Sequence, residues 1–302
     1  MHCIFRLLGL ILEGSNRSEP LKAAFWMVGA MISFTLMAVA GRSLASELDT
    51  FEIMMYRSFI GILLVLAFSF YFKTITEVNL LKIRLHFFRN LMHFIGQNLW
   101  FYAVIFVPLS QMFAFEFSTP VWVAVMAPFF LSERLTLVRI SAAFTGFIGI
   151  LIVARPDLSE ISLPIIAAAL CAIFFASTSV ATKLLTREQT VTGILFWLVF
   201  IQAIFGIVTA GFDGDIAYPS SANMPWVILV GICGLAAHLS ITKALTLAPA
   251  IIVMPLEFLR LPLISIVGFL LYNEGFEWQV WLGALIILMA NAINIRSEMT
   301  SK

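Results

Sequence analysis

Charged side chains are scarce in this sequence of 302 residues. Aspartate, glutamate, lysine and arginine make up 12% of the chain, whereas 61% of the residues are hydrophobic. A soluble domain has about 25% charged residues and about half apolar ones. A soluble globule of this size has too little interior to hide such an excess of apolar side chains. The composition therefore predicts an integral membrane protein in contact with a lipid bilayer.

Net charge is almost absent as well. The 18 lysines and arginines nearly balance the 17 aspartates and glutamates, so the formal net charge is +1. A chain with so little excess charge has no basic surface for nucleic acid and no acidic surface for cationic partners. We therefore expect no nucleic-acid partner.

Cysteine and histidine are also rare. The three cysteines, Cys3, Cys171 and Cys233, are odd in number and widely spaced, so we expect buried thiols rather than a disulfide framework or a metal cluster. The four histidines form no HExxH-like pattern, no serine is paired with a catalytic base, and no phosphate-binding loop is present. The sequence thus disfavours an enzyme and an ATP-driven pump, and it indicates no metal and no cofactor.

Long apolar runs dominate what remains. A helix needs about 20 largely apolar residues to cross a bilayer, and short polar or turn-forming segments such as SERLT separate the runs. The short apolar patch within residues 1–21 is too brief for a signal peptide, so we expect a cytoplasmic tail there. Ten runs predict membrane-spanning helices, at about 22–41, 52–71, 86–106, 110–131, 137–154, 163–182, 191–211, 225–246, 250–272 and 277–295.

The basic residues predict the orientation. With a cytoplasmic N-terminus, most of the 18 lysines and arginines fall on the cytoplasmic side, and only Arg42 and Arg155 fall on the opposite side. Cytoplasmic loops of membrane proteins carry such an excess of lysine and arginine. An even number of spans also places the C-terminus inside. We expect a multi-pass protein of the cytoplasmic (inner) membrane of a bacterium, with both termini cytoplasmic.

The two halves of the chain repeat each other at a fixed offset of about 141 residues. FVPLSQMFAFEF at 106–117 corresponds to LAPAIIVMPLEF at 247–258. Each repeat holds five spans, an odd number, so the second copy enters the membrane upside down. This predicts an all-α integral membrane fold of ten transmembrane helices as two inverted five-helix repeats, 22–155 and 163–296, with a cytoplasmic tail at 297–302. Transporters of this architecture bind solute near mid-membrane between the repeats. The offset pairs Pro108 with Pro249, Glu116 with Glu257, Glu133 with Glu274 and Arg42 with Lys183.

These motifs point to a known family. The first half reads WFYAVIFVPLSQMFAFEFSTPVW and then FFLSERLT; the second reads TKALTLAPAIIVMPLEF and then FLLYNEGFE. The pattern, over residues 22–296, resembles the EamA-type transporters of the drug/metabolite transporter superfamily. Members of that superfamily move amino acids, nucleotide-like cofactors, vitamins, carboxylates and drugs, some inward and some outward. Importers of riboflavin and S-adenosylmethionine belong to this broad group. The resemblance implies the fold and a small-molecule substrate, without selecting one.

Ionisable residues inside the spans are the candidates for a functional site, because a charge at the bilayer centre is costly. Glu116 and Glu257 lie at matching depths from opposite sides, so we expect them to line a central cavity and to bind solute or a coupling proton. The alternative is a structural role beside the prolines of these spans. Arg260 is either a partner of Glu257, three residues before it, or a site for an anion. We expect Arg57 and Arg89 to extend their charges towards water at the membrane surface.

Polar and aromatic residues beside these charges complete the candidate set. His93 and His238 titrate near neutral pH and could relay a proton, although a hydrogen-bonding role is the alternative. Gln97 lies one turn from His93, so span 3 is expected to border the cavity. Trp100 and Trp122 are the candidates for stacking on a flat or cationic solute.

The function that these patterns favour is secondary active transport of a small polar metabolite by alternating access, coupled to protons or to exchange. Solutes that resemble amino acids, vitamins or nucleotides are the expected class. A drug or metabolite efflux pump of the same fold is the main alternative. A channel is disfavoured because nothing in the sequence repeats as a filter or pore ring does. We expect a monomer or a homodimer.

Overall fold

The computed structural model describes residues 19–133, 136–154, 162–212, 214–273 and 278–300. Within these ranges the chain is helical and contains no strand. The expected N-terminal tail falls almost entirely outside the described residues. The helices are α2 (Pro20–Leu44), α3 (Thr50–Tyr71), η1 (Ile75–Glu77), α4 (Ile83–Phe106), α5 (Leu109–Glu116), α6 (Thr119–Phe130), α7 (Leu137–Ala154), α8 (Leu163–Leu185), α9 (Val191–Ala210), α10 (Met224–Leu247), α11 (Ala250–Val253), η2 (Met254–Leu259), α12 (Arg260–Tyr272) and α13 (Trp278–Thr300).

Local sequence signals explain where several helices begin. Asp49 accepts a hydrogen bond from the Glu52 backbone N–H at 2.8 Å, and the Glu52 carboxylate accepts one from the Asp49 N–H at 2.9 Å. This reciprocal capping box satisfies two backbone donors at the start of α3. Thr190 caps α9 by accepting from the Gly193 N–H at 3.2 Å. Proline stands in the first turn of α2, α8 and α10, where its missing N–H costs nothing.

Two of the expected spans are interrupted near their centres. The run expected at 110–131 is divided at Phe117 and Ser118, between α5 and α6. The run expected at 250–272 contains α11, the 3₁₀ segment η2 and α12. Pro120 and Pro255 lie beside these interruptions, and proline removes a backbone donor and disturbs the helix. Broken helices at membrane depth occur where the freed backbone is buried in protein or lines a cavity.

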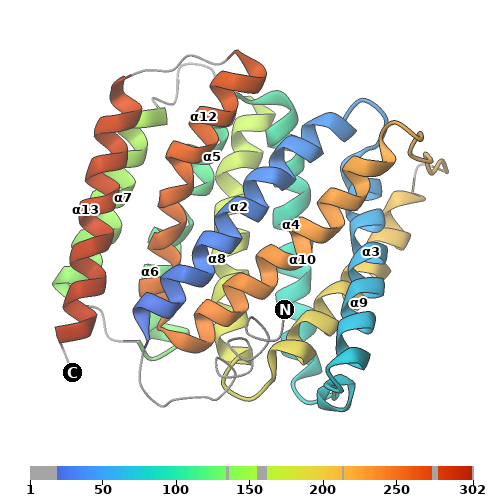
Figure 1. The fold of residues 1–302 in the computed structure, drawn as a ribbon, viewed down its shortest axis with the longest axis horizontal. Coiled ribbons are helices and arrows are strands. Elements are labelled where there is room, and N and C mark those ends of the chain that lie inside the picture. Colours follow the sequence, from blue (N-terminus) through green and yellow to red (C-terminus); the bar gives the residue numbers. More distant parts are fainter. Residues whose placement is uncertain (1–18, 134–135, 155–161, 213, 274–277, 301–302) are drawn as a thin grey trace.

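The helices form a wide bundle of three groups (Figure 1). Helices α7 and α13 pack together along one side, and α3 and α9 along the other. Between them, α2 packs along α10 and α4 packs along α8. The start of α2 and the end of α13 lie at the same end of the molecule. Each of these packing pairs joins one helix from the first half of the chain to one from the second.

Equivalent hydrogen bonds form within each half, at positions related by the sequence offset. Arg42 donates to the carbonyls of Val104 and Val107, both at 2.7 Å. Lys183 donates to the carbonyls at the corresponding positions, Leu245 at 2.6 Å and Ala248 at 2.8 Å. In each half, a basic residue near the end of the first helix thus satisfies carbonyls at the end of the third. This arrangement fits a two-repeat fold.

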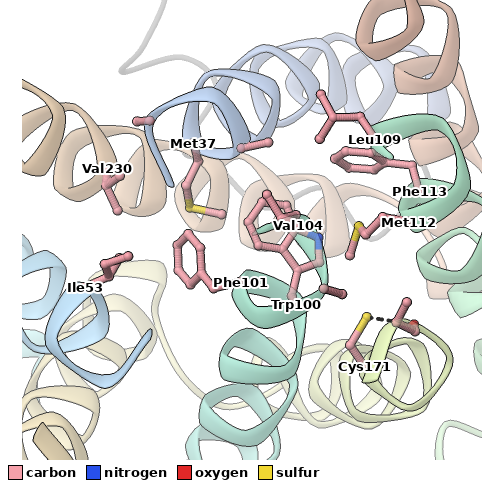
Figure 2. Close-up of a cluster of buried hydrophobic side chains, with 14 of the residues drawn as sticks. Met37, Ile53, Trp100, Phe101, Val104, Leu109, Met112, Phe113, Cys171 and Val230 are labelled. Carbon is pink, nitrogen blue, oxygen red and sulfur yellow. Dashed lines mark hydrogen bonds between the residues drawn. The ribbon is translucent and has the colours of Figure 1, made fainter. Parts of the chain in front are cut away.

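The core and the outer surface differ in what they contact. Figure 2 shows Met37, Trp100, Phe101 and Phe113 packed between helices of both halves. Cys171 and Cys233 are buried with free thiols, as the sequence predicts, and Cys3 lies outside the described residues. Many large apolar side chains are exposed on the outer surface, such as Phe25 on α2 and Phe129 on α6. A soluble surface rarely carries so many, whereas a lipid-facing one does.

Six helical segments of the described chain are long and apolar enough to cross a membrane. They are Pro20–Leu44, Thr50–Tyr71, Leu163–Leu185, Val191–Ala210, Met224–Leu247 and Ala250–Tyr272. Helix α4 is long enough but is not in this set, and it carries Arg89, His93 and Gln97 in its interior. At the C-terminal end, the expected tail from 297 is helical as far as Thr300.

We predict that Arg42→Met and Lys183→Met each destabilise the protein. Each substitution leaves two helix-terminal carbonyls without a charged donor, and hydrogen bonds to charged groups contribute about 1.5–3 kcal/mol. Arg42 also stands 4.6 Å from the Tyr272 ring centroid, so we expect the larger loss there. The measurement is the free energy of unfolding in detergent. The control is Arg84→Met on an exposed residue of α4, and a Lys183→Met protein as stable as this control would contradict the prediction.

Candidate functional site

A pocket of about 500 Å³, counting its opening, lies where the halves meet. It is lined by side chains of α2, α4, α8 and α10 and by residues at the interruptions of the two broken spans. The polar lining residues are Arg89, His93, Gln97, Trp100, Glu116, Thr119, Thr178, Ser179, Thr182, His238 and Glu257, and the apolar ones are Phe34, Met37, Phe175, Ile241 and Met254.

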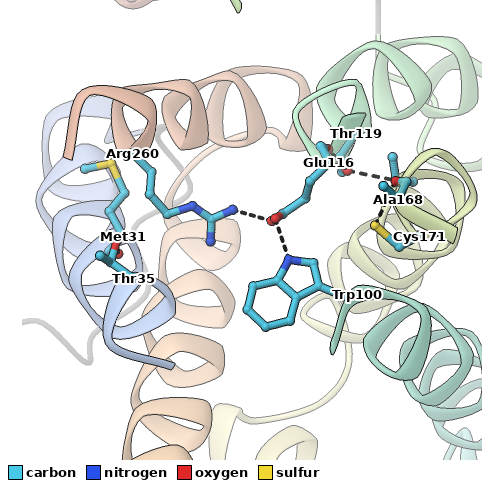
Figure 3. Close-up of polar contacts among 9 residues, drawn as sticks. Met31, Thr35, Trp100, Glu116, Thr119, Ala168, Cys171 and Arg260 are labelled. Atoms are coloured by element: carbon cyan, nitrogen blue, oxygen red, sulfur yellow. Dashed lines mark hydrogen bonds and ion pairs between the residues drawn. The ribbon is translucent and has the colours of Figure 1, made fainter. Parts of the chain in front are cut away.

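A buried ion pair crosses this region. Arg260, the first residue of α12, forms an ion pair and hydrogen bond with Glu116, the last residue of α5. Trp100 donates its indole N–H to the other oxygen of the same carboxylate at 2.5 Å. Figure 3 shows the three side chains converging from α12, α5 and α4. Glu116 is 5% exposed and Arg260 is 1% exposed, so both charges are removed from bulk water within the protein.

Aromatic rings surround the guanidinium of Arg260. Its central carbon stands 4.8 Å from the ring centroid of Phe113 and 5.0 Å from those of Phe34 and Phe117. Ring faces attract a cation more strongly when both are desolvated. Phe113 and Phe117, which flank Glu116 in the sequence, therefore stabilise the charge of Arg260. Arg260 in turn neutralises the charge of Glu116.

Glu257 lies close to this pair but is not part of it. Its carboxylate lines the pocket, and the described residues supply no ion pair or hydrogen bond to its side chain. Of the two roles that the sequence left open for Arg260, pairing with Glu257 is not observed among the described residues, because Arg260 reaches across to Glu116 in the other half of the chain. Glu257 is therefore the carboxylate of the pocket without a direct cationic partner.

One face of α4 borders the pocket along about three turns. Arg89, His93, Gln97 and Trp100 follow one another at spacings of four, four and three residues, which places them on one side of a helix. The distance from Arg89 to Trp100 along the axis is about 16 Å at 1.5 Å per residue. The polar stripe that His93 and Gln97 predicted thus continues towards both ends of the helix.

The two candidate histidines meet in this pocket. The ring centroids of His93 and His238 are 4.5 Å apart, with the ring planes nearly perpendicular. Both nitrogens of His93 and the Nε2 atom of His238 are buried without a hydrogen-bond partner in the described part of the protein. Buried polar atoms normally have a partner in protein, water or ligand. These rings therefore offer hydrogen bonds to a molecule in the pocket.

Three sequence-based expectations require correction. Trp122 is 39% exposed and does not line the pocket, because it lies on α6, beyond the break that separates this helix from α5. Arg57 and Arg89 do not extend to the membrane surface, because they are 6% and 1% exposed. Their helices pack against neighbours on the side where these two residues lie, so the charges stay inside the protein.

The pocket also contains residues that the sequence analysis missed. Thr178, Ser179 and Thr182 place a row of hydroxyl groups along one face of α8. Their spacing of three and four residues was a readable signal within an otherwise apolar run. Glu133 has a structural role, since it accepts hydrogen bonds from the backbone N–H groups of Ala250 at 3.0 Å and Ile251 at 3.2 Å. Its sequence counterpart Glu274 lies outside the described residues.

Solved and curated proteins resemble this chain over most of its length. A chain of known crystal structure, 15% identical, superposes with a TM-score of 0.73 over 90% of this chain and 95% of its own; this likeness concerns the fold. An S-adenosylmethionine uptake transporter of Rickettsia felis is 25% identical over 276 residues, 90% of this chain and 92% of that protein. A riboflavin transporter of Rhizobium johnstonii is 30% identical over 296 residues, 93% of this chain and 94% of that protein.

The family assignment follows from both halves of the sequence. The EamA-like transporter family matches residues 21–155 and again residues 162–296. The named relatives are transporters rather than enzymes. The resemblance drawn from the two motifs is thus confirmed, and the chain belongs to the EamA-like transporter family.

Proposed function

We propose that this protein is a secondary active transporter that carries a small polar metabolite across the cytoplasmic membrane by alternating access. Ten spans form two inverted repeats, 22–155 and 163–296, and both termini are cytoplasmic. The solute occupies the pocket between the repeats. Coupling is to a proton or to a second solute in exchange, and Glu257 is the candidate proton carrier because it lines the pocket without an ion pair.

The ion pair between Glu116 and Arg260 is the observation that carries this proposal. It joins α5 of one half to α12 of the other inside the pocket region. While the two desolvated charges are in contact, they hold the halves together. If they separate, each charge needs water or solute to replace its lost partner. Making and breaking this pair is therefore a physical means of switching between two arrangements of the halves.

The interrupted spans supply the flexibility that such a change requires. Glu116 is the last residue of α5, and Arg260 directly follows η2, so each charge stands at a break in its span. A 3₁₀ segment inside a longer helical run often marks a hinge. Solute sites of transporters with inverted repeats commonly lie at discontinuous helices.

The relatives support a metabolite as the solute and uptake as the direction. They are named as S-adenosylmethionine uptake and riboflavin transporters. The aromatic rings of Trp100, Phe34 and Phe175 line the pocket, and such rings stack on flat heterocycles. Efflux of a metabolite by the same fold stays the alternative, because the pocket itself has no inherent direction.

Two surface contacts support the proposed topology. Lys82, in the loop before α4, forms an ion pair of 3.0 Å with Glu188, in the loop before α9. Glu47, in the loop before α3, accepts a hydrogen bond from the Ser220 N–H, in the loop before α10, at 3.0 Å. The positive-inside bias assigns the first pair of loops to the cytoplasm and the second pair to the opposite side.

We predict that Glu116→Gln lowers solute flux by at least about tenfold, a change of 1.4 kcal/mol. The measurement is flux of S-adenosylmethionine or riboflavin into proteoliposomes. The variant also leaves Arg260 buried without a countercharge, which costs about 3–5 kcal/mol of unfolding free energy. The double variant Glu116→Gln/Arg260→Gln should recover most of this stability, yet it should stay inactive because the switch is absent.

Glu188→Gln is the matched control, since Glu188 is exposed and its ion pair lies at the surface. Exposed pairs contribute at most about 1 kcal/mol, so we expect flux and stability near those of the unmodified protein. Flux at the unmodified rate in the double variant would show that the ion pair is structural and would overturn the proposed switch.

We predict that cysteines placed at Lys82 and Arg187 react with a membrane-impermeant thiol reagent only from the cytoplasmic side. A cysteine at Tyr218, which is 86% exposed in the loop before α10, should react only from the opposite side. The experiment uses intact cells and inverted vesicles in a background without the three native cysteines. Labelling of the Lys82 position in intact cells would refute the topology.

A further inference from the structure

Arg89 is a buried cation that the ion pair of the pocket does not explain. It is 1% exposed and lines the pocket from α4. Its Nε donates to the Thr182 hydroxyl at 3.1 Å, and one terminal nitrogen donates to the Asn90 side-chain oxygen at 2.9 Å. A guanidinium has five N–H donors, and the described residues accept from only these two directions. The remaining donors of Arg89 are therefore available on the pocket side.

A second buried arginine stands behind it. Arg57 is 6% exposed and lines a smaller neighbouring pocket together with Gln202. Gln202 donates to the Asn90 backbone carbonyl at 2.8 Å, which links the two pockets through α4. Within the described part of the chain, the Arg57 guanidinium donates to the Met54 sulfur at 3.2 Å, and its positive charge repels that of Arg89.

Carboxylates do not balance these two charges within the described part of the chain. Glu116 is held by Arg260 and Trp100. Glu52 accepts from the backbone N–H groups of Asp49 and Ala217. Glu257 forms no ion pair or hydrogen bond with Arg89 among the described residues. Arginine stays protonated under all ordinary conditions, so neither guanidinium removes the cost of its burial by losing a proton.

The surroundings of Arg89 are those of an oxyanion site. On α8, Ser179 lines the same pocket with a hydroxyl group, whereas the hydroxyls of Thr178 and Thr182 donate to the backbone carbonyls of Phe174 and Thr178 at 2.9 and 2.7 Å. Charged hydrogen bonds from a planar guanidinium suit carboxylate and phosphate groups particularly well. A membrane-buried charge without a partner is costly and marks a functional site by default. A bound anion supplies the missing countercharge in a way that no residue here does.

Resting on the proposed function, we propose that Arg89, supported by the charge of Arg57 and the hydroxyl of Ser179, binds an oxyanion group of the transported solute. The substrate class is thus a metabolite with a carboxylate or phosphate group. With its anion on Arg89, such a solute lies along His93 and Gln97 and brings its remaining part towards Trp100. A neutral heterocycle lacks the group that this end of the pocket is built to hold.

The test uses solute pairs that differ by one anionic group. The purified full-length protein, in an uncharged detergent, is titrated with riboflavin and riboflavin 5′-phosphate, and with S-adenosylmethionine and its decarboxylated form. The measured quantities are the increase in Tm and the binding affinity. In at least one pair, we expect the anionic member to bind about tenfold more tightly or better, as expected for charged hydrogen bonds. The phosphate and carboxylate pairs show which oxyanion is preferred.

Variants assign the preference to Arg89. Arg89→Gln should abolish it, Arg89→Lys should retain part of it, and Arg84→Gln, on an exposed residue of the same helix, should leave it intact. Arg57→Gln keeps Arg89 in place and should reduce the preference for the anionic solute by a smaller factor. If the Arg89→Gln protein does not fold, the Arg57→Gln protein is tested instead. Equal binding within both pairs, no binding of any of the four solutes, or a preference that survives Arg89→Gln would overturn the anion site.

The outcome is distinguishable from failure of the transport proposal. Proteoliposome flux that depends on Glu116, with no discrimination within the solute pairs, leaves transport standing and removes the anion site. If binding discriminates within the solute pairs and depends on Arg89, but no flux is measured, the anion site stands and the transport proposal fails.

Discussion

The buried ion pair between Glu116 and Arg260 is the constraint on which the centre of this protein depends. Each charge alone would be costly among Phe113, Phe117 and the other apolar side chains of the two spans. Each also stands at the helix end that the backbone dipole disfavours, an acid at the end of α5 and a base at the start of α12. Their contact removes both penalties at once, and Trp100 fixes the geometry with a third hydrogen bond.

This pair breaks the symmetry of the two repeats. The offset of 141 residues places Glu257 opposite Glu116, but it places Thr119 opposite Arg260. The framework contacts, in which Arg42 and Lys183 cap corresponding helices, follow the repeat closely. The pocket does not, because Glu116 has an ion-pair partner whereas Glu257 has none in the described part of the chain. A symmetric scaffold thus carries an asymmetric site, as a transporter requires if its two ends are to bind and release solute differently.

The polar lining is divided between two kinds of charge. At the broken spans, Glu257 adds negative charge beside the neutral ion pair, whereas Arg89 brings positive charge some three helical turns away along α4. His93 and Gln97 lie between, with nitrogen atoms that have no hydrogen-bond partner among the described residues. Apolar rings separate these groups and face the same space. Such a lining suits a solute that is partly flat and apolar and partly charged.

The sequence by itself determined the class and the family, and it singled out several of the residues that line the candidate pocket. Apolar runs predicted the helices, the fixed offset paired Glu116 with Glu257, and the motifs around them gave the EamA family. The rarity of charge in the spans singled out the same acids that line the pocket. These results need only composition, periodicity and self-similarity, all of which are local or repeated in the chain.

Only the tertiary structure decided which charges meet. Arg260 is three residues from Glu257 and far along the chain from Glu116, yet it pairs with Glu116, because the breaks in the two spans bring α5 and α12 together. Arg57 and Arg89 looked close enough to the membrane surface to reach water, but neighbouring helices bury them. Trp122 lies on α6, beyond the break in its span, and is 39% exposed. The partner of a buried charge depends on how helices pack around it, and that packing is set by contacts between residues that are distant in sequence.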